Sequence, residues 1–377
     1  MIIIDGSGGE GGGQILRTAL SLSALTGKPF RIERIRAGRR QPGLRPQHLT
    51  AARAAAAICG ARLEGDLLGS RSLLFEPQHT SRAGRYEFDV REASSGGSAG
   101  SASLVLQTLL LPLAAAAGSS TLVLRGGTHV AWSPPFHYLQ EVYLPCLRRM
   151  GIVARIALDM WGWYPQGGGE MQATIRGAGL VSDPRGTCQE TRIPSSMPGI
   201  QPPPSPFQMS ERGELRRIWG ISATSRLPDH VRQRMRQHAL TLLRPAGVRA
   251  EIETIDAPSP GPGAGMFLFA EYESESGEIA PAGFSGFGRR GKPAEAVASE
   301  AAQTLLAHHR SGAVVDPHLA DQIILPLALS GTTARFRTSE ITRHLETNAQ
   351  VVGHFLDVRF RLGGPGMEDG TVMLEAG

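Results

Sequence analysis

The feature that most constrains the fold of this chain is an internal repetition. The run Leu111-Pro-Leu-Ala114 returns as Leu325-Pro-Leu-Ala328, and each run ends an apolar helical segment before a glycine, a strand entry rich in Ser or Thr, and a histidine. A second similarity joins Glu10-Gly-Gly-Gly-Gln14 to Gln166-Gly-Gly-Gly-Glu170. Repeated units of this kind predict a large domain built by duplication. Because the runs are short, chance similarity among Ala- and Gly-rich helices stays the alternative.

Strand and helix patterns alternate along the first part of the chain, which predicts an α+β fold. Apolar periodicity and breaker residues indicate a strand over 1–5, a loop over 6–13, a helix over 14–26 and a strand over 29–36. The same reasoning adds helices over 51–59 and 101–117 and strands over 72–76 and 85–90.

A change in composition marks a second domain. Residues 177–206 are rich in Ser, Pro and Gly, and prolines cannot donate to a sheet ladder, so we interpret this stretch as an exposed linker. A β-α-β-β pattern follows it, and the helix that begins at Pro293 resumes the first pattern. We therefore expect a large domain over 1–180 and 281–377, with a small domain over 181–280 inserted into it. The elements expected in the small domain are a strand over 214–223, a helix over 228–243, and strands over 248–255 and 265–272.

The cysteines and the apolar runs indicate a cytoplasmic protein. Three cysteines, Cys59, Cys146 and Cys188, are widely separated and support neither a disulfide framework nor a CxxC metal site. No apolar run approaches the roughly 20 residues of a membrane span. We expect no membrane partner.

The glycine-rich segment over 6–13 predicts an anion site. It lies between a strand and a helix, where backbone N–H groups and the helix dipole favour negative charge. It contains a G-x-G-x-x-G, but Glu33 falls inside the next predicted strand rather than at its end, which weakens a dinucleotide interpretation. The lone carboxylate of Glu10 among glycines favours Mg²⁺ or Mn²⁺ coordination. A tight turn without a ligand is the alternative.

An arginine-rich run follows the second predicted strand. Residues 34–48 hold five arginines with glycines and prolines, close to the glycine-rich segment and to Arg17 of the first helix. This density favours a clamp for a polyphosphate or an RNA backbone over an ordinary solvated loop. Only Lys28 and Lys292 are lysines, which leaves few candidates for an enzyme that forms a lysyl-AMP.

Among eleven histidines, His344 is distinguished by its surroundings in the run Ile341-Thr-Arg-His344-Leu-Glu-Thr-Asn348. A neutral imidazole is about three-quarters populated at pH 7 with a pKa near 6.5, so it can attack an α-phosphate without a separate base. Judged on local sequence alone, a surface or core histidine is the more frequent case.

Taken together, these runs resemble the RNA 3′-terminal phosphate cyclase family, and the resemblance covers nearly the whole chain. The matching motifs, in chain order, are Asp5-Gly…Glu10-Gly-Gly-Gly-Gln-Ile-Leu-Arg17, Ile35-Arg-Ala-Gly-Arg39…Pro42-Gly-Leu…Gln47-His48-Leu, Leu106-Gln107-Thr, Gly126-Gly-Thr128…Pro134-Pro135, Pro165-Gln-Gly-Gly-Gly169, Leu319-Ala-Asp321-Gln322 and His344-Leu-Glu-Thr-Asn348.

The resemblance implies a ligase that cyclises RNA 3′-phosphate ends with ATP and Mg²⁺ or Mn²⁺. Members of the family form a histidyl-AMP and pass the adenylate to a terminal 3′-phosphate, which gives RNA(3′)pp(5′)A. The vicinal 2′-OH then displaces AMP and leaves a 2′,3′-cyclic phosphate. The chemistry is sound because AMP is a good leaving group and the neighbouring hydroxyl has a large proximity advantage.

Residue roles are implied by motif position. His344 would be the nucleophile, Glu10 a metal ligand, and Gln107 an ATP contact near the metal and phosphates. Two further sets are implied: phosphate or RNA contacts at Arg17, Arg36 and Arg39, and an adenosine pocket of Pro134, Tyr138, His318, Asp321 and Gln322. The implied fold is a large domain of repeated units, each a four-stranded sheet plus two helices, with a smaller inserted α/β domain.

The chain departs from the family pattern at three places. Trp161 replaces the basic residue that usually precedes the glycine signature, and Met171 replaces a branched aliphatic residue at its far end. His318 stands where tyrosine often lies over the adenine, although an imidazole can still stack. The proline-rich stretch over 184–206 is longer than the family needs.

Two other functions compete with a cyclase. A catalytically silent, cyclase-like scaffold for ribosomal RNA processing is disfavoured because His344, Glu10 and the three arginines are present. An NADP-dependent oxidoreductase that uses the glycine-rich segment and the arginines for the 2′-phosphate leaves the histidine motif unexplained.

Overall fold

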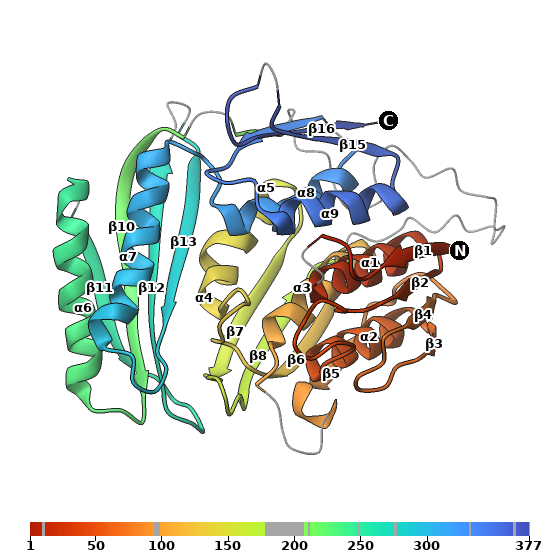
Figure 1. The fold of residues 1–377 in the computed structure, drawn as a ribbon, viewed down its shortest axis with the longest axis horizontal. Helices are drawn as coiled ribbons and strands as arrows, with labels where there is room; N and C mark the ends of the chain where they lie inside the picture. Colours follow the sequence, from red (N-terminus) through yellow and green to blue (C-terminus); the bar gives the residue numbers. More distant parts are fainter. Residues whose placement is uncertain are drawn as a thin grey trace.

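The computed structural model describes residues 1–9, 12–93, 99–177, 207–209, 212–247, 249–273, 277–331, 333–364 and 367–376. These residues form four four-stranded sheets, each covered by helices. Figure 1 shows three of these layered units packed together, with the fourth, in green to cyan, at one side. The predicted α+β class is confirmed.

The first two units share one topology. Each begins with a parallel strand pair joined by a helix, followed by helical structure and an antiparallel pair, in the spatial orders β1-β2-β4-β3 and β5-β6-β8-β7. The first unit comprises β1 (Ile2–Asp5), α1 (Gly13–Thr26), β2 (Phe30–Glu33), α2 (Pro46–Cys59), β3 (Arg62–Glu64) and β4 (Leu73–Glu76). The second comprises β5 (Arg85–Asp89), α3 (Ala102–Ala115), β6 (Ser120–Gly126), α4 (Phe136–Tyr138), a π-helical turn (Leu139–Tyr143), α5 (Leu144–Arg149), β7 (Ala154–Met160) and β8 (Gly169–Ile175).

A third unit repeats this topology but is interrupted in sequence. β9 (Phe207–Met209) pairs in parallel with β14 (Ala334–Arg337), in the order β15-β16-β14-β9. Its remaining elements are α8 (Pro317–Leu329), α9 (Arg343–Phe355), β15 (Val358–Leu362) and β16 (Thr371–Ala376). The two Leu-Pro-Leu-Ala runs lie in α3 and α8, the equivalent first helices of their units, so the predicted duplication is confirmed.

The second sequence similarity does not mark equivalent positions. The described end of the first run, Gly12 to Gln14, begins α1, whereas Gln166 to Glu170 lie at the turn from β7 into β8. Glycine serves different purposes there, since Gly167 and Gly168 adopt positive φ angles of 66° and 73° in a strand connection. The prediction that these two glycine runs are repeats of one another is therefore wrong.

The fourth unit is inserted between β9 and α8. It comprises β10 (Glu214–Ser225), α6 (Asp229–Leu243), a short 3₁₀ turn (Arg244–Ala246), β11 (Ala250–Asp256), β12 (Gly263–Glu273), β13 (Ile279–Phe287) and α7 (Ala294–Ser311). α7 packs on β12, β13 and α6, so this helix covers the inserted sheet rather than resuming the repeats. The predicted domain boundaries stay a prediction, and the one at residue 280 falls inside β13.

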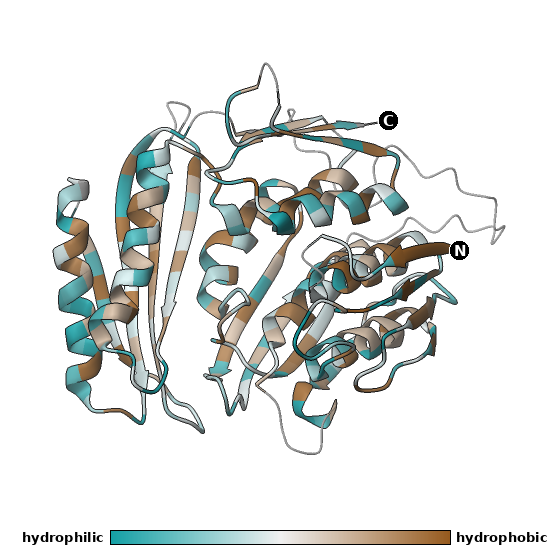
Figure 2. Cartoon of the chain, in the orientation of Figure 1, coloured by the Kyte–Doolittle hydropathy of each residue, from teal (hydrophilic) through white to brown (hydrophobic). Residues whose placement is uncertain are grey.

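The surface of the inserted unit follows from its residue pattern. Met235, Ala239 and Leu243 are the buried residues of α6 and recur every fourth position, which places them on one face. The rest of α6 is mostly hydrophilic (Figure 2). In the part of the chain that the structure describes, no helix is long and apolar enough to cross a membrane.

The second strand ends earlier than predicted. β2 stops at Glu33 because Arg34 and Arg36 both adopt φ of 54°, a left-handed conformation that a strand does not accommodate. The expectation that Glu33 lies inside the strand is therefore wrong, since Glu33 ends it. The backbone then turns back, and the amide of Gly43 donates to the Ile35 carbonyl oxygen at 2.8 Å.

Candidate active site

One pocket lies where the three repeats meet. α1 packs against α3 and α9, and α8 packs against α9, so helices from all three units converge there. The pocket is lined by Gln14, Arg17, Thr18, Ser21, Gln107, Thr108, Leu111, Tyr143, Gln322, Leu325 and Asn348. Most of these side chains are polar although the helices that carry them are largely buried, which marks the pocket as a candidate binding site.

A hydrogen-bond network centred on Asn348 fixes the pocket wall. The Asn348 amide donates to the Asp321 carbonyl oxygen at 2.6 Å and accepts from Thr18 Oγ1 at 2.5 Å. Gln14 Nε2 donates to Asp321 Oδ2 at 3.3 Å. α1, α8 and α9 are thereby joined through buried polar groups, and such groups hold a specific geometry when each has a partner.

A second link joins α3 to α8. Gln107 Nε2 donates to Gln322 Oε1 at 2.7 Å, and Gln322 Nε2 donates to the His318 carbonyl oxygen at 2.7 Å. These two predicted site residues therefore lie in direct contact although they are 215 positions apart.

His344 lies at the start of α9, one turn before Asn348. It is the second residue of the helix and is partly buried. Thr342 caps the helix by accepting a hydrogen bond from the Leu345 amide at 3.1 Å. Backbone amides at such a start and the helix dipole favour an anion. A phosphate approaching His344 would therefore meet partial positive charge.

The glycine-rich loop contacts the same helix. A Cβ added to Gly9 would lie 2.0 Å from Thr347 Oγ1, so only a residue without a side chain permits this approach. The loop is anchored by Asp5, which accepts from Ser7 N at 3.0 Å and Ser7 Oγ at 2.7 Å and pairs with Arg34. The hydrogen bonds from Ser7, followed by the charge of Arg34, hold the pKa of Asp5 below its ordinary value.

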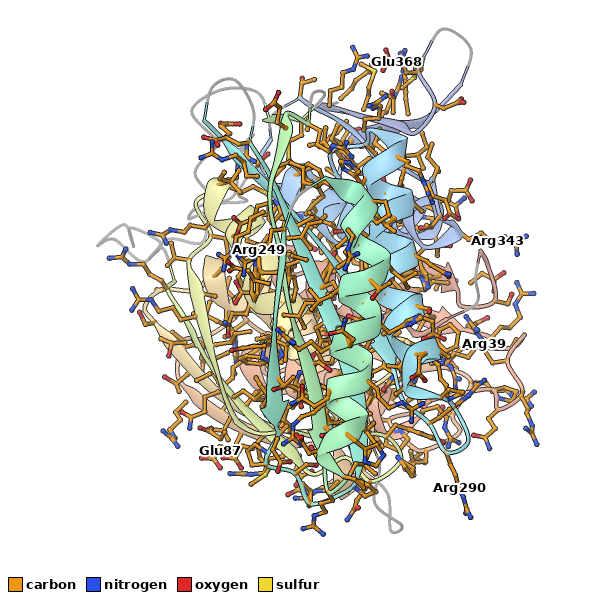
Figure 3. The ribbon with its side chains drawn as sticks, turned by 90° about the vertical axis from the view of Figure 1, so that its left-hand side faces the viewer. Arg39, Glu87, Arg249, Arg290, Arg343 and Glu368 are labelled. Atoms are coloured by element: carbon orange, nitrogen blue, oxygen red, sulfur yellow. The ribbon has the colours of Figure 1, made fainter. Side chains whose placement is uncertain are left out.

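The arginine-rich run folds onto this loop. A Cβ on Gly12 would lie 3.4 Å from Arg39 Nη2, and one on Gly13 would lie 2.9 Å from Arg17 Nη1. Arg36 Nη1 donates to the carbonyl oxygens of Gln41 at 2.8 Å and Gly43 at 3.1 Å, which holds the turn closed. Figure 3 shows Arg39 and Arg343, the neighbour of His344, projecting from the same edge of the molecule.

His48 was not singled out by sequence reasoning. Its ring is buried, its Nδ1 accepts from the Arg45 amide at 3.1 Å, and its Nε2 would lie 2.0 Å from a Cβ on Gly13. Burial, with the charges of Arg17, Arg36 and Arg45, holds the pKa of His48 well below its ordinary value. The imidazole therefore stays neutral among arginines.

Burial also shifts two charged groups of the pocket. Desolvation lowers the pKa of Arg17 to about 10, against the opposing effect of Asp321. Desolvation raises the pKa of Asp321 to about 7, although His318, Gln14 and Arg17 favour its ionised form. Strongly shifted groups in a pocket are typical of functional sites.

Three of the residues predicted around adenosine, His318, Asp321 and Gln322, lie in α8, and Tyr138 contacts the cap of that helix. The Tyr138 hydroxyl donates to the Asp316 carboxylate at 2.9 Å and 3.1 Å, and Asp316 caps α8 by accepting from the amides of His318 and Leu319. His318 is exposed, whereas Tyr138 is buried. Pro134 is partly buried and precedes α4 in sequence.

The predicted residues therefore fall into three groups. Arg17, Gln107 and Gln322 line the pocket itself. Other predicted residues lie outside the lining but next to its helices: Asp321 contacts Gln14, His344 lies at the start of α9, Tyr138 contacts the cap of α8 and His318 follows that cap, and Arg39 lies beside Gly12. Arg36 holds the turn after β2, and Pro134 precedes α4. Glu10 and the stretch over 184–206 lie outside the described residues.

Residues missed by the sequence prediction also contribute. Gln14, Thr18 and Asn348 line the pocket, and Asp316 caps the helix that carries His318. A signal was available for Asn348, because it lies four positions after His344 and so on the same helix face.

The departure at Trp161 has a packing explanation. Trp161 is buried and stacks on His129 with ring centroids 3.9 Å apart. His129 Nε2 and His137 Nδ1 share a hydrogen bond of 2.9 Å, and burial lowers the pKa of His137 to about 4. A charged residue would be costly at position 161 beside these neutral rings.

Comparison with known proteins decides the family. A model of the family described as RNA 3′-terminal phosphate cyclase matches residues 8–362. The chain belongs to the RNA 3′-terminal phosphate cyclase family. It is 49% identical to the RNA 3′-terminal phosphate cyclase of Nostoc punctiforme over 94% of both chains. It is 48% identical to that of Methylococcus capsulatus over 97% of this chain and 95% of the relative, and 40% identical to that of Archaeoglobus fulgidus over 94% and 96%.

The topology agrees with this family rather than with a dinucleotide-binding fold. The sheet that carries the glycine-rich loop has a single parallel pair, β1 with β2, and its other pairs are antiparallel. A dinucleotide-binding sheet is mostly parallel with helices on both faces. The oxidoreductase alternative therefore has no support in the fold.

Proposed function

We propose that this chain uses ATP to convert an RNA 3′-terminal phosphate into a 2′,3′-cyclic phosphate, with His344 as the nucleophile. The observation that carries this proposal is that α9 links three features: its Asn348 lines the polar pocket together with Arg17, its Thr347 contacts Gly9 of the glycine-rich loop, and its His344 lies one turn before Asn348. Membership of the cyclase family supports the same activity.

In the first step, a ring nitrogen of His344 attacks the α-phosphorus of ATP. A P–N bond forms, the bond to the β-phosphate oxygen breaks, and pyrophosphate leaves. Arg17 and Arg39 would neutralise phosphate charge, and the amides at the start of α9 would stabilise the charge that develops on the α-phosphate.

In the later steps, the RNA itself supplies the nucleophiles. A 3′-phosphate oxygen attacks the adenylate phosphorus and His344 leaves, which gives RNA(3′)pp(5′)A. The vicinal 2′-OH then attacks the phosphorus of the RNA phosphate, its proton is lost, and AMP departs. The arginine-rich run would hold the RNA end so that its hydroxyl reaches that phosphorus.

A divalent metal at this site would be held mainly by the phosphates of its substrate. Among the described residues no group of three or more His, Cys, Asp or Glu side chains could hold a metal. Mg²⁺ is usually bound through one or two carboxylates together with substrate phosphates and water. We propose that Glu10 holds it, with Gln107 near the phosphates, and that the metal neutralises phosphate charge when bound.

Labelling with α-³²P ATP tests the proposal. Wild-type protein is expected to take up label that survives alkali and is lost in acid, as a phosphoramidate is. His344→Ala is expected to take up none. His354→Ala is the matched control, because His354 is an exposed histidine near the other end of the same helix.

Two results would contradict the proposal. Absence of label on wild-type protein would remove the adenylylation step, and equal labelling of His344→Ala would move the nucleophile elsewhere. Cyclisation is tested separately with 3′-phosphorylated oligonucleotides. A 2′-OH end should yield a cyclic phosphate, whereas a 2′-H end should stop at the adenylate.

A further inference from the structure

Trp132 combines two unfavourable properties. Its side chain is 99% exposed, and its φ of 66° lies in the left-handed region that an indole-bearing residue rarely adopts. By contrast, Trp161 and Trp163 are 5% and 3% exposed. A large apolar ring held in solvent by a strained backbone has no folding explanation, and such strain is found preferentially where a residue meets a ligand.

The loop that carries Trp132 is held firmly at its base. The Phe136 amide donates to the Thr128 carbonyl oxygen at 3.0 Å and closes the loop. Within it, Ser133 Oγ donates to the Val130 carbonyl oxygen at 3.1 Å. Thr128 N in turn donates to the Gly162 carbonyl oxygen at 3.0 Å. Trp132 is therefore presented by an ordered loop, which reduces the entropy lost when its ring binds a partner.

One side of this loop adjoins the arginine-rich run. Gly127 N donates to the Gly100 carbonyl oxygen at 2.8 Å, and the adjacent Ser101 amide donates to Gln47 Oε1 at 3.0 Å. Gln47 lies in the first turn of α2, and Arg45, the last arginine of the run, is the N-cap of that helix. The base of the loop that carries Trp132 is thus linked by hydrogen bonds to the start of α2, close in sequence to the predicted phosphate contacts.

The other side of the loop adjoins α8. Pro134 and Pro135 lead into α4, and Tyr138 of that helix donates to Asp316, the cap of α8. The loop that carries Trp132 is therefore attached on one side to the segment that contacts Gln47 of α2, and on the other side, through α4, to the cap of α8. Those residues include buried groups, Tyr138 and Asp321, whereas Trp132 faces solvent.

We propose that Trp132 stacks on a nucleobase at the 3′ end of the RNA substrate. This inference rests on the proposed function. Nucleotides that precede the reacting phosphate must run along the exposed surface beside the arginines, and an aromatic face beside a basic groove is the usual platform for single-stranded bases. Every base offers a π face, so the contact would tolerate different end sequences.

Fluorescence and binding measurements test the contact directly. A single-stranded RNA that ends in a 3′-phosphate is titrated into four proteins: wild type, Trp132→Phe, Trp132→Ala and the control Ile279→Ala. Ile279 is an exposed apolar residue of the inserted unit. It pairs with Glu273 at one end of the β12–β13 ladder, whereas Gly265, which lies close to Trp163, is at the other end. Trp132→Ala is expected to bind RNA at least about fivefold more weakly, with Trp132→Phe close to wild type. RNA should quench tryptophan fluorescence in wild type but much less in Trp132→Phe.

Adenylylation by ATP alone separates this inference from the proposed function. It needs no RNA, so Trp132→Ala should label at the wild-type rate while transfer to RNA weakens. A raised KM for ATP in Trp132→Ala would place the indole on the adenine instead and overturn the inference. Unchanged RNA affinity, with no loss of quenching in Trp132→Phe, would also overturn it. If wild type is not labelled at all, the proposed function fails, whereas the RNA-binding result still decides the role of Trp132.

Discussion

The side chain of Asn348 donates a hydrogen bond of 2.6 Å to the backbone carbonyl oxygen of Asp321. The two residues lie on α9 and α8, and Asn348 also accepts from Thr18 on α1. One buried amide thus joins three helices from two repeats. Its removal leaves buried polar groups without partners, which is costlier than the loss of an exposed hydrogen bond.

Asn348→Ala is expected to destabilise the protein and to slow adenylylation. Unpaired buried groups cost about 1–3 kcal/mol each, and in a large domain each kcal/mol lowers Tm by roughly 2–4 °C. We expect a fall of several degrees in calorimetry and a labelling rate reduced about tenfold, because α9 also carries His344. Gln350→Ala, an exposed change on the same helix, should alter neither. An unchanged Tm for Asn348→Ala would contradict the role of this network.

Gly9→Ala is expected to displace the glycine-rich loop from α9. The new methyl group would lie 2.0 Å from Thr347 Oγ1, and Gly9 has a φ of 55° that alanine tolerates poorly. Labelling with ATP should fall at least about tenfold as the phosphate site distorts. Gly38→Ala is the control, because a Cβ there meets nothing within 4 Å.

A double variant distinguishes the clash from the backbone strain. Thr347→Ala removes the hydroxyl that Gly9→Ala would meet, so the pair should recover part of the lost activity. Recovery would show that the loop acts by its contact with α9. If Gly9→Ala alone were fully active, the close packing of loop and helix would have no bearing on adenylylation.

The repeated architecture was readable from the sequence because its signals are local. The helix predicted over 14–26 appears as Gly13–Thr26, and Gly27 ends it with a φ of 70°. The two Leu-Pro-Leu-Ala runs identified equivalent helices because both units bury the same apolar face. The placement of α7 was not readable, since Ala-rich helices of the repeats and of the inserted unit have similar patterns.

The site was less readable because it depends on contacts between distant segments. Thr18 and Asn348 are 330 positions apart, and Gln107 and Gln322 are 215 apart. No local pattern indicates such pairs, so only the ordered set of motifs supported a catalytic role for His344. The left-handed turn at Arg34 and Arg36 was equally hidden, because arginine carries no preference for that conformation.

Arg17→Ala is expected to lower kcat/KM for ATP about a hundredfold in the labelling reaction. Arg17 is a pocket residue whose charge persists at neutral pH, since its pKa is lowered only to about 10. Arg17→Lys should restore little, because lysine lacks the planar fork that binds phosphate in two places. Arg53→Ala, an exposed change on α2, is the control. Full activity of Arg17→Lys would show that charge alone suffices.

Asp321 is expected to make stability depend on pH. Burial raises the pKa of its carboxyl from 3.8 to about 7 in the folded chain. Between these values the folded chain binds more protons than the unfolded chain, so the free energy of unfolding falls as pH rises. The fall begins near pH 4, levels off above pH 7, and amounts to at most about 4 kcal/mol.

Asp321→Asn should remove most of this dependence, because an amide is neutral throughout and still accepts from Gln14. Urea unfolding at pH 5, 6 and 8 measures it, and at pH 8 the variant should be more stable than wild type. Asp89→Asn is the control. Although burial opposes ionisation there, Arg91 holds the pKa of Asp89 below its ordinary value. The contribution of Asp89 to the free energy of unfolding therefore changes only at lower pH. If Asp321→Asn unfolds with the wild-type dependence between pH 5 and 8, the carboxyl is already ionised in the folded protein and its partnership with Arg17 outweighs burial.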